Sequence, residues 1–178
     1  MVRRVPYGIM NYAEMVRKKG YFIDKTRYIE RLEGVQNPVF LRPRRFGKSL
    51  FCSILAYYYD ICEAHRFEEL FGHTWIGQNP TETHNQYIVL KFDFSVIAVS
   101  DDLNDTEYAF NRHCTGRILE TWYSYPDYME SAPELAPDEK ASTALSLWLG
   151  YLQKTGASQV YVIIDEYDNF VNQYITSH

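Results

Sequence analysis

The fold of this chain is decided by the stretch Phe40-Leu41-Arg42-Pro43-Arg44-Arg45-Phe46-Gly47-Lys48-Ser49-Leu50. Together with the two residues before it, the stretch opens with an apolar run that predicts a buried central strand over Pro38–Leu41. Gly47 predicts a tight turn, and the apolar spacing after it predicts a helix. A strand, a turn with Gly-Lys-Ser and a helix form the layout of a phosphate-binding P-loop, in which backbone N–H groups and the positive helix end attract phosphate.

A second motif lies far downstream, where the apolar run Val160-Tyr161-Val162-Ile163-Ile164 ends in Asp165 and Glu166. Such a buried strand with two terminal carboxylates is typical of a Walker B motif. Asp165 is placed to hold Mg²⁺ through one of its waters, and Glu166 to orient and deprotonate an attacking water. Such a base would be unfavourable in a kinase, because an activated water would compete with the substrate that accepts the phosphate. The pair therefore favours hydrolysis of a nucleoside triphosphate.

The P-loop residues have separate expected roles in binding phosphate and Mg²⁺. Lys48 can reach the terminal phosphates, and the Ser49 hydroxyl can ligate Mg²⁺. We expect catalysis to depend on Lys48 and Glu166, and Mg²⁺ to be held by Ser49 and Asp165. The residues expected to bind the nucleotide are Arg44, Arg45, Phe46, Gly47, Lys48, Ser49 and Leu50.

The loop departs from the general pattern G-x-x-x-x-G-K-[ST] in one respect. Arg42 stands where the first glycine is usual, and Pro43 after it has no N–H to donate. Arg44 and Arg45 add two positive charges. They either clamp phosphate in bidentate fashion or are solvated surface residues, and the sequence leaves both readings open.

Composition indicates a globular chain with a real core. The 178 residues are 46% hydrophobic and 23% charged, which excludes a disordered polar chain. A net charge of -5 argues against nucleic-acid binding by the surface as a whole, although a local basic patch remains open. The 16 tyrosines and 10 phenylalanines form either a large aromatic core or a surface for a partner.

The sequence also predicts a cytoplasmic location. Three scattered cysteines lack metal-ligand spacing and are typical of a reduced protein. The N-terminus has no apolar signal-peptide core, and no run approaches the length of a membrane span.

Strands and helices alternate along the chain. We expect strands over Pro38–Leu41, Tyr87–Phe94 and Gln159–Asp165. We expect helices over residues 12–19, 25–33, 49–62, 67–71, 104–123 and 138–155, and a further helix from about 169 to 175. The alternation predicts an α/β fold, a P-loop NTPase-like parallel sheet with helices on both faces. Residues 1–36 are then a lead-in with a helix before the P-loop, and residues 37–178 a P-loop core.

Local signals mark several of these boundaries. Asp24 can cap the helix that begins at Lys25, and residues 72–86 have the composition of a loop. Asn104 with Glu107 resembles a capping box, and Gly156 ends the last long helix. Asp93 ends a strand near the expected site and is either a polar site residue or the cap of the following turn.

Three segments together resemble the predicted AAA-ATPase-like family of bacterial proteins: Tyr21–Thr26, Phe40–Leu50 and Ile164–Asp168. The resemblance spans nearly the whole chain and implies ATP, Mg²⁺ and an α/β P-loop fold. In that family the arginine-containing loop is the normal form. By analogy with related ATPases, Ile23, Asp24 or Thr26 contacts the adenine base; the alternative is that this segment packs as a leading helix.

Members of the family often carry a C-terminal domain resembling PD-(D/E)XK nucleases. The chain resembles the N-terminal part of such a protein, so we expect a partial core that lacks the strand after Walker B. An open sheet edge of this kind invites self-association.

Three functions remain open at this point. The first is an ATP-binding, Mg²⁺-dependent ATP hydrolase that acts as a switch for an attached or partner domain. The second is a non-catalytic interaction or regulatory module with weak or no nucleotide binding. The third is a small-molecule kinase, with Arg112 and Arg117 available for a lid. The expected partners are ATP, a nuclease-like domain or another protein, and a second copy, but neither a membrane nor nucleic acid.

Overall fold

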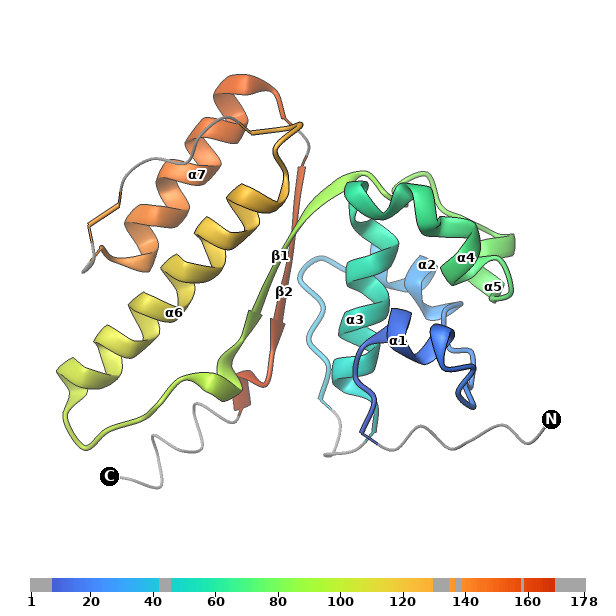
Figure 1. The fold of residues 1–178 in the computed structure, drawn as a ribbon, viewed down its shortest axis with the longest axis horizontal. Coiled ribbons are helices and arrows are strands. Elements are labelled where there is room, and N and C mark those ends of the chain that lie inside the picture. The colour runs from blue at the N-terminus through green and yellow to red at the C-terminus, as the bar shows by residue number, and fades with distance from the viewer. Residues whose placement is uncertain (1–7, 42–45, 130–134, 137–138, 158, 169–178) are drawn as a thin grey trace. The chain divides into compact units, whose positions relative to one another are not determined.

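The computed structural model describes residues 8–41, 46–129, 135–136, 139–157 and 159–168. The chain divides into two compact units, residues 1–87 and residues 88–178, which we call unit 1 and unit 2 and describe separately (Figure 1). Unit 1 contains α1 (Tyr12–Arg17), α2 (Tyr28–Glu33), α3 (Lys48–Tyr59), the 3-10 helix η1 (Ile61–Arg66), α4 (Phe67–Phe71) and α5 (Trp75–Gln78). Unit 2 contains nearly all of β1 (Tyr87–Asp93), then η2 (Phe94–Val96), α6 (Leu103–Ser124), α7 (Ala141–Thr155) and β2 (Gln159–Asp165).

Aromatic side chains form the core of unit 1. The rings of Tyr12 and Phe71 lie 5.2 Å apart, those of Tyr58 and Phe71 lie 5.5 Å apart, and all three side chains are fully buried. The Tyr12 hydroxyl donates a hydrogen bond to the carbonyl of Leu70. A buried tyrosine needs such a partner for its hydroxyl, so the core joins α1, α3 and α4 through both apolar and polar contacts.

The segment before α2 is held by two side chains that the sequence analysis read differently. Asp24 accepts hydrogen bonds from the N–H groups of Thr26 and Trp75, at 2.8 and 2.7 Å. The Thr26 hydroxyl accepts from the N–H of Ile76 at 3.1 Å. The prediction that Asp24 caps a helix starting at Lys25 was wrong, because its carboxylate instead caps α5 across unit 1. That helix also interrupts the loop expected over residues 72–86.

No strand forms over Pro38–Leu41, so this prediction was wrong. Val39 and Leu41 are 71% and 77% exposed. A strand needs a hydrogen-bonded neighbour, and in the described residues the sheet consists of β1 and β2 alone. Phe40 nevertheless packs edge-on against Phe51 of α3, with ring centroids 5.5 Å apart, which fixes this segment beside the helix.

Unit 2 is built on a sheet of two parallel strands joined by a crossover through two helices. The arrows of β1 and β2 point the same way, and α6 and α7 lie on one side of them (Figure 1). This single crossover covers one face of the sheet. Burial alternates along β1, and Val162 and Ile164 of β2 are each 49% exposed. The sequence predicted three buried strands with helices on both faces of the sheet. Unit 2 instead has two strands, and its helices lie on one face.

The boundaries of the helices differ from the expected ones by a few residues. Asp102, not Asn104, caps α6 by accepting from the N–H of Asn104. The last long helix begins at Ala141 rather than residue 138, and it ends as expected at Gly156, which has a left-handed φ of 66°. The helix expected after residue 168 lies outside the described residues. None of the helices in the described residues is long and apolar enough to cross a membrane.

Candidate functional site

The N-terminus of α3 is formed by residues that the sequence analysis assigned to the nucleotide. Gly47 is the N-cap residue, with a left-handed φ of 79° that L side chains rarely adopt. The first turn has neither a side-chain cap nor an acidic residue. The first backbone bond of the helix runs from the N–H of Phe51 to the carbonyl of Gly47, so the three N–H groups before it point out of the helix end. Such an end attracts an anion.

The individual residues of this turn have distinct environments. Lys48, Ser49 and Leu50 are half-buried in the first turn of α3, whereas the side chain of Phe46 is 65% exposed. Arg44 and Arg45 lie outside the described residues, as do Arg42 and Pro43. Both interpretations of Arg44 and Arg45, as phosphate-binding residues or as solvated surface residues, therefore stay predictions.

The rest of α3 is fixed by packing, which gives its N-terminus a rigid support. Ser53 is buried, and its hydroxyl accepts a hydrogen bond of 2.9 Å from the N–H of Tyr12 at the start of α1. Ile54, Leu55 and Tyr58 are buried on the same helix. A site built on a packed helix is held more firmly than one on a loop.

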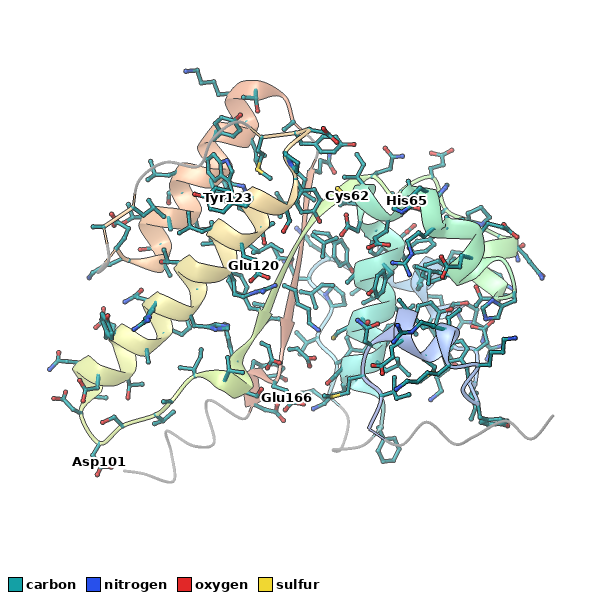
Figure 2. The ribbon with its side chains drawn as sticks, in the orientation of Figure 1. Cys62, His65, Asp101, Glu120, Tyr123 and Glu166 are labelled. Carbon is teal, nitrogen blue, oxygen red and sulfur yellow. The ribbon has the colours of Figure 1, made fainter. Side chains whose placement is uncertain are left out.

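The second half of the candidate site is the carboxyl end of β2, where Figure 2 labels Glu166. Asp165 is 5% exposed, and its Oδ1 atom accepts a hydrogen bond of 3.0 Å from the N–H of Glu166. Glu166 itself has a left-handed φ of 55°. A residue with a Cβ atom is strained in this conformation, and such strain collects at functional sites.

The two halves belong to different units: Lys48 and Ser49 to unit 1, and Asp165 and Glu166 to unit 2. The helix after Gly47 and the strand that ends at Asp165 form as the sequence predicts, whereas the strand predicted before the P-loop does not. That the two act on one nucleotide remains a prediction.

Asp93 at the end of β1 has a structural role. Its Oδ1 atom accepts hydrogen bonds from the N–H of Ser95, at 3.0 Å, and from the Ser95 hydroxyl, at 2.6 Å. Of the two readings that the sequence left open, the turn cap is the one that these contacts support.

A magnesium site of the P-loop type would suit the residues present. In the described part of the chain, no group of three or more His, Cys, Asp and Glu side chains could hold a metal ion. Mg²⁺ bound to a nucleotide does not require such a group, because it takes most of its oxygens from phosphates and water. The Ser49 hydroxyl and the buried Asp165 carboxylate are hard oxygen donors of the kind it prefers.

The left-handed backbone of Glu166 could not be predicted from the sequence. Glycine or asparagine is the usual local signal for a left-handed residue, and glutamate gives no such signal. The two carboxylates at the end of an apolar strand were the only indication that the position is unusual.

A comparison with protein families covers almost the whole chain. The family model described as Predicted AAA-ATPase matches residues 6–178. The chain belongs to the AAA-ATPase-like family. This membership confirms the resemblance carried by the three segments that begin at Tyr21, Phe40 and Ile164, and it agrees with a general ATPase-like role. No curated protein and no solved structure matches the chain.

Proposed function

We propose that this AAA-ATPase-like chain binds the triphosphate of ATP at the N-terminus of α3 and hydrolyses it in a Mg²⁺-dependent reaction. In this proposal, hydrolysis switches an attached or partner domain. The observation that carries it is the start of α3, where a left-handed Gly47 precedes Lys48 and the first turn has no side-chain cap and no acidic residue. Membership of the Predicted AAA-ATPase family supports the same reading. No guanine-specific Asn-Lys-x-Asp element occurs in the sequence, which favours adenine.

Each residue has a defined part in this proposal. The Lys48 ammonium group binds the terminal phosphates and offsets the charge that develops on them. Ser49 and Asp165 would hold Mg²⁺, which when bound neutralises phosphate charge as a Lewis acid. The Glu166 carboxylate orients a water and accepts its proton. Arg44 and Arg45 add positive charge beside the phosphates.

The direct test is titration calorimetry of ATP with Mg²⁺ into the full chain and into Lys48→Ala. We expect the variant to lose most of the ATP affinity, because one charge-assisted contact to phosphate disappears. Lys154→Ala, which removes an exposed lysine at the end of α7, is the matched control and should bind as the wild type does. Equal affinity of Lys48→Ala and wild type would refute the phosphate site.

Glu166→Gln separates hydrolysis from binding. The change keeps the size of the side chain and removes its basicity, so ATP should still bind while phosphate release falls by a factor of about 10²–10⁴. Unchanged phosphate release, or phosphate transfer to a small acceptor that tolerates the substitution, would favour the kinase reading instead.

A second candidate function has its own supporting observation. The side chains of Val162 and Ile164, each 49% exposed, give β2 an apolar face on the solvent side. Exposed apolar strands commonly serve as contact surfaces, which supports a non-catalytic interaction module as the second candidate function. Light scattering at several concentrations tests it: an oligomer that forms without ATP turnover would favour this reading, and a monomer that hydrolyses ATP would oppose it.

A further inference from the structure

The surface at the start of α2 gathers cations around one exposed tyrosine. The guanidinium carbons of Arg27 and Arg31 lie 5.3 and 5.5 Å from the centroid of the Tyr28 ring, and Tyr28 is 40% exposed. The charge of Lys25 also acts on the Tyr28 hydroxyl. We call Lys25, Arg27, Tyr28 and Arg31 the basic patch.

The three cations of the basic patch are not neutralised within the described residues. No ion pair joins Lys25, Arg27 or Arg31 to a described carboxylate. Glu33 lies two positions after Arg31, but its carboxylate accepts hydrogen bonds from the hydroxyls of Tyr59 and Thr81 instead. Within the described residues, the cations of the patch are therefore not engaged in ion pairs.

The fold of α2 accounts for Arg31, because a cation in the last turn of a helix is favoured, but it does not account for Arg27. Arg27 is the N-cap residue of α2 and makes no side-chain capping bond. Small polar or acidic residues are favoured there, because the positive end of the helix repels a cation. The contacts that Arg27 makes, over the Tyr28 ring and to the Tyr28 hydroxyl at 3.5 Å, do not cap the helix, so its place there points to a functional reason.

Charge is distributed very unevenly between the two units. Residues 1–87 contain 13 Lys and Arg against 9 Asp and Glu, whereas residues 88–178 contain 5 against 14. Unit 1 is therefore basic, although the net charge of the whole chain is -5. The expectation that nucleic acid is not a partner rested on this net value, which does not describe unit 1.

Apolar and aromatic side chains are exposed immediately before the basic patch. Tyr21 and Ile23 are 54% and 63% exposed in the segment that leads to α2. Neither is needed in the core of unit 1, where Phe22 packs on Tyr12 with ring centroids 5.5 Å apart. Exposed aromatic rings among arginines and lysines are the combination on which unpaired bases stack while phosphates are neutralised.

We propose that the basic patch, with Tyr21 beside it in sequence, binds single-stranded nucleic acid without strong sequence preference. Arg27 and Arg31 contact successive phosphates, and the exposed tyrosines offer stacking surfaces to bases. The Tyr28 ring holds both guanidinium groups in place, so less side-chain entropy is lost on binding than for free arginines. A duplex would present phosphates but no unpaired base, so the single strand is the better ligand. The basic patch contains none of the residues proposed to bind the triphosphate.

The test is fluorescence anisotropy of a labelled oligo(dT) strand with the full chain at several salt concentrations. We expect a Kd on the order of 10⁻⁴–10⁻⁶ M that weakens with salt. Arg27→Gln/Arg31→Gln should weaken binding about tenfold or more. It should also reduce the slope of log K against log salt by about 1.4, since each phosphate of a single strand contributes about 0.7. Tyr28→Leu, which keeps the charges and removes the ring, should weaken binding less.

Two controls keep this result apart from the proposed ATP site and from misfolding. Lys154→Gln removes one cation from unit 2 and should leave oligo(dT) binding unchanged. The double arginine variant should keep the circular dichroism spectrum and the ATP affinity of the wild type. Equal oligo(dT) affinity of the double variant and the wild type would overturn the proposal. So would duplex binding as tight as that of the single strand, or binding to phosphatidylserine vesicles but not to oligo(dT).

Discussion

The Asp165 carboxylate accepts a hydrogen bond from the backbone N–H of Glu166, whose φ of 55° is left-handed. The bond joins two consecutive residues at the end of β2 and turns the chain sharply after the strand. Asp165 is buried, so its oxygen is held in place and stabilises the strained neighbour. The two carboxylates therefore differ in role at the level of structure: one fixes the turn, and the other is presented by it.

This arrangement predicts a measurable difference between two substitutions at Glu166. Both Glu166→Gly and Glu166→Ala remove the carboxylate, but only glycine adopts a positive φ without strain. The free energy of unfolding of Glu166→Gly should exceed that of Glu166→Ala by about 1 kcal/mol. Urea unfolding of the two variants measures the difference. Equal stability would mean that the left-handed conformation is not strained in this chain.

The outer edge of β1 is closed by side chains rather than by another strand. The Val89 N–H donates a hydrogen bond of 2.9 Å to the Tyr125 hydroxyl, and the Arg117 Nε–H donates one of 3.0 Å to the Lys91 carbonyl. Val89 and Lys91 are two apart, so their backbone groups face the same edge. Polar side chains on such an edge prevent it from pairing with another chain.

We expect Tyr125→Phe to lower the free energy of unfolding by about 1–2 kcal/mol. The substitution removes the hydroxyl and leaves the Val89 N–H without its acceptor at a partly buried position. Tyr123→Phe is the matched control, because Tyr123 lies two residues before Tyr125, near the end of α6, and is 68% exposed (Figure 2). If the two substitutions cost the same, the hydroxyl of Tyr125 has no special part in closing the edge.

The sequence predicted those elements whose signals are local. The apolar run before Asp165 gave β2 its bounds, and Gly156 marked the end of α7 with the left-handed conformation that glycine favours. The start of α3 after Gly47 followed from the same kind of signal. In each case the deciding residues lie within a few positions of the feature that they determine.

Features that depend on distant partners could not be predicted in this way. The Asp24 carboxylate would suit the N-terminus of a following helix. It instead accepts a hydrogen bond from the backbone N–H of Trp75, 51 positions further along. The apolar segment Pro38–Leu41 has the composition of a strand, yet composition does not supply a hydrogen-bonded neighbour. For the candidate site, sequence indicated which residues carry the chemistry, whereas the strain at Glu166 is visible only in the backbone.

Substitution of Thr26 tests the hydrogen bond that links the segment before α2 to α5. Thr26 is fully buried, and its hydroxyl accepts a hydrogen bond from the N–H of Ile76. Thr26→Val keeps the shape and removes this acceptor, so we expect the free energy of unfolding to fall by about 1–2 kcal/mol. Thr143→Val on the exposed side of α7 controls for the change of residue type.

The same variant separates two readings of this segment. If Thr26 is structural, ATP affinity measured well below the unfolding transition should stay at the wild-type value. A large loss of ATP affinity with little loss of stability would instead place Thr26 in contact with the nucleotide.

His113 should make stability depend on pH in mildly acidic solution. Its ring packs beside Phe94 of η2, and its Nε2 atom is buried with no hydrogen-bond partner among the described residues. Burial lowers the pKa of His113, the charge of Arg117 lowers it further, and Asp93 partly opposes both effects. The folded chain therefore favours the neutral imidazole.

The sign of the effect follows from this lowered pKa. As the pH falls through about 6.5, the unfolded chain takes up a proton at this position before the folded chain does, so the free energy of unfolding falls. One proton limits the slope to about 1.4 kcal/mol per pH unit, and the partial exposure of the ring keeps the effect below that limit. Urea unfolding of wild type and His113→Phe between about pH 7.5 and 5.5 should show a shallower loss in the variant. Replacing the exposed His65 by phenylalanine controls for the loss of a histidine, and parallel curves for wild type and His113→Phe would contradict the assignment.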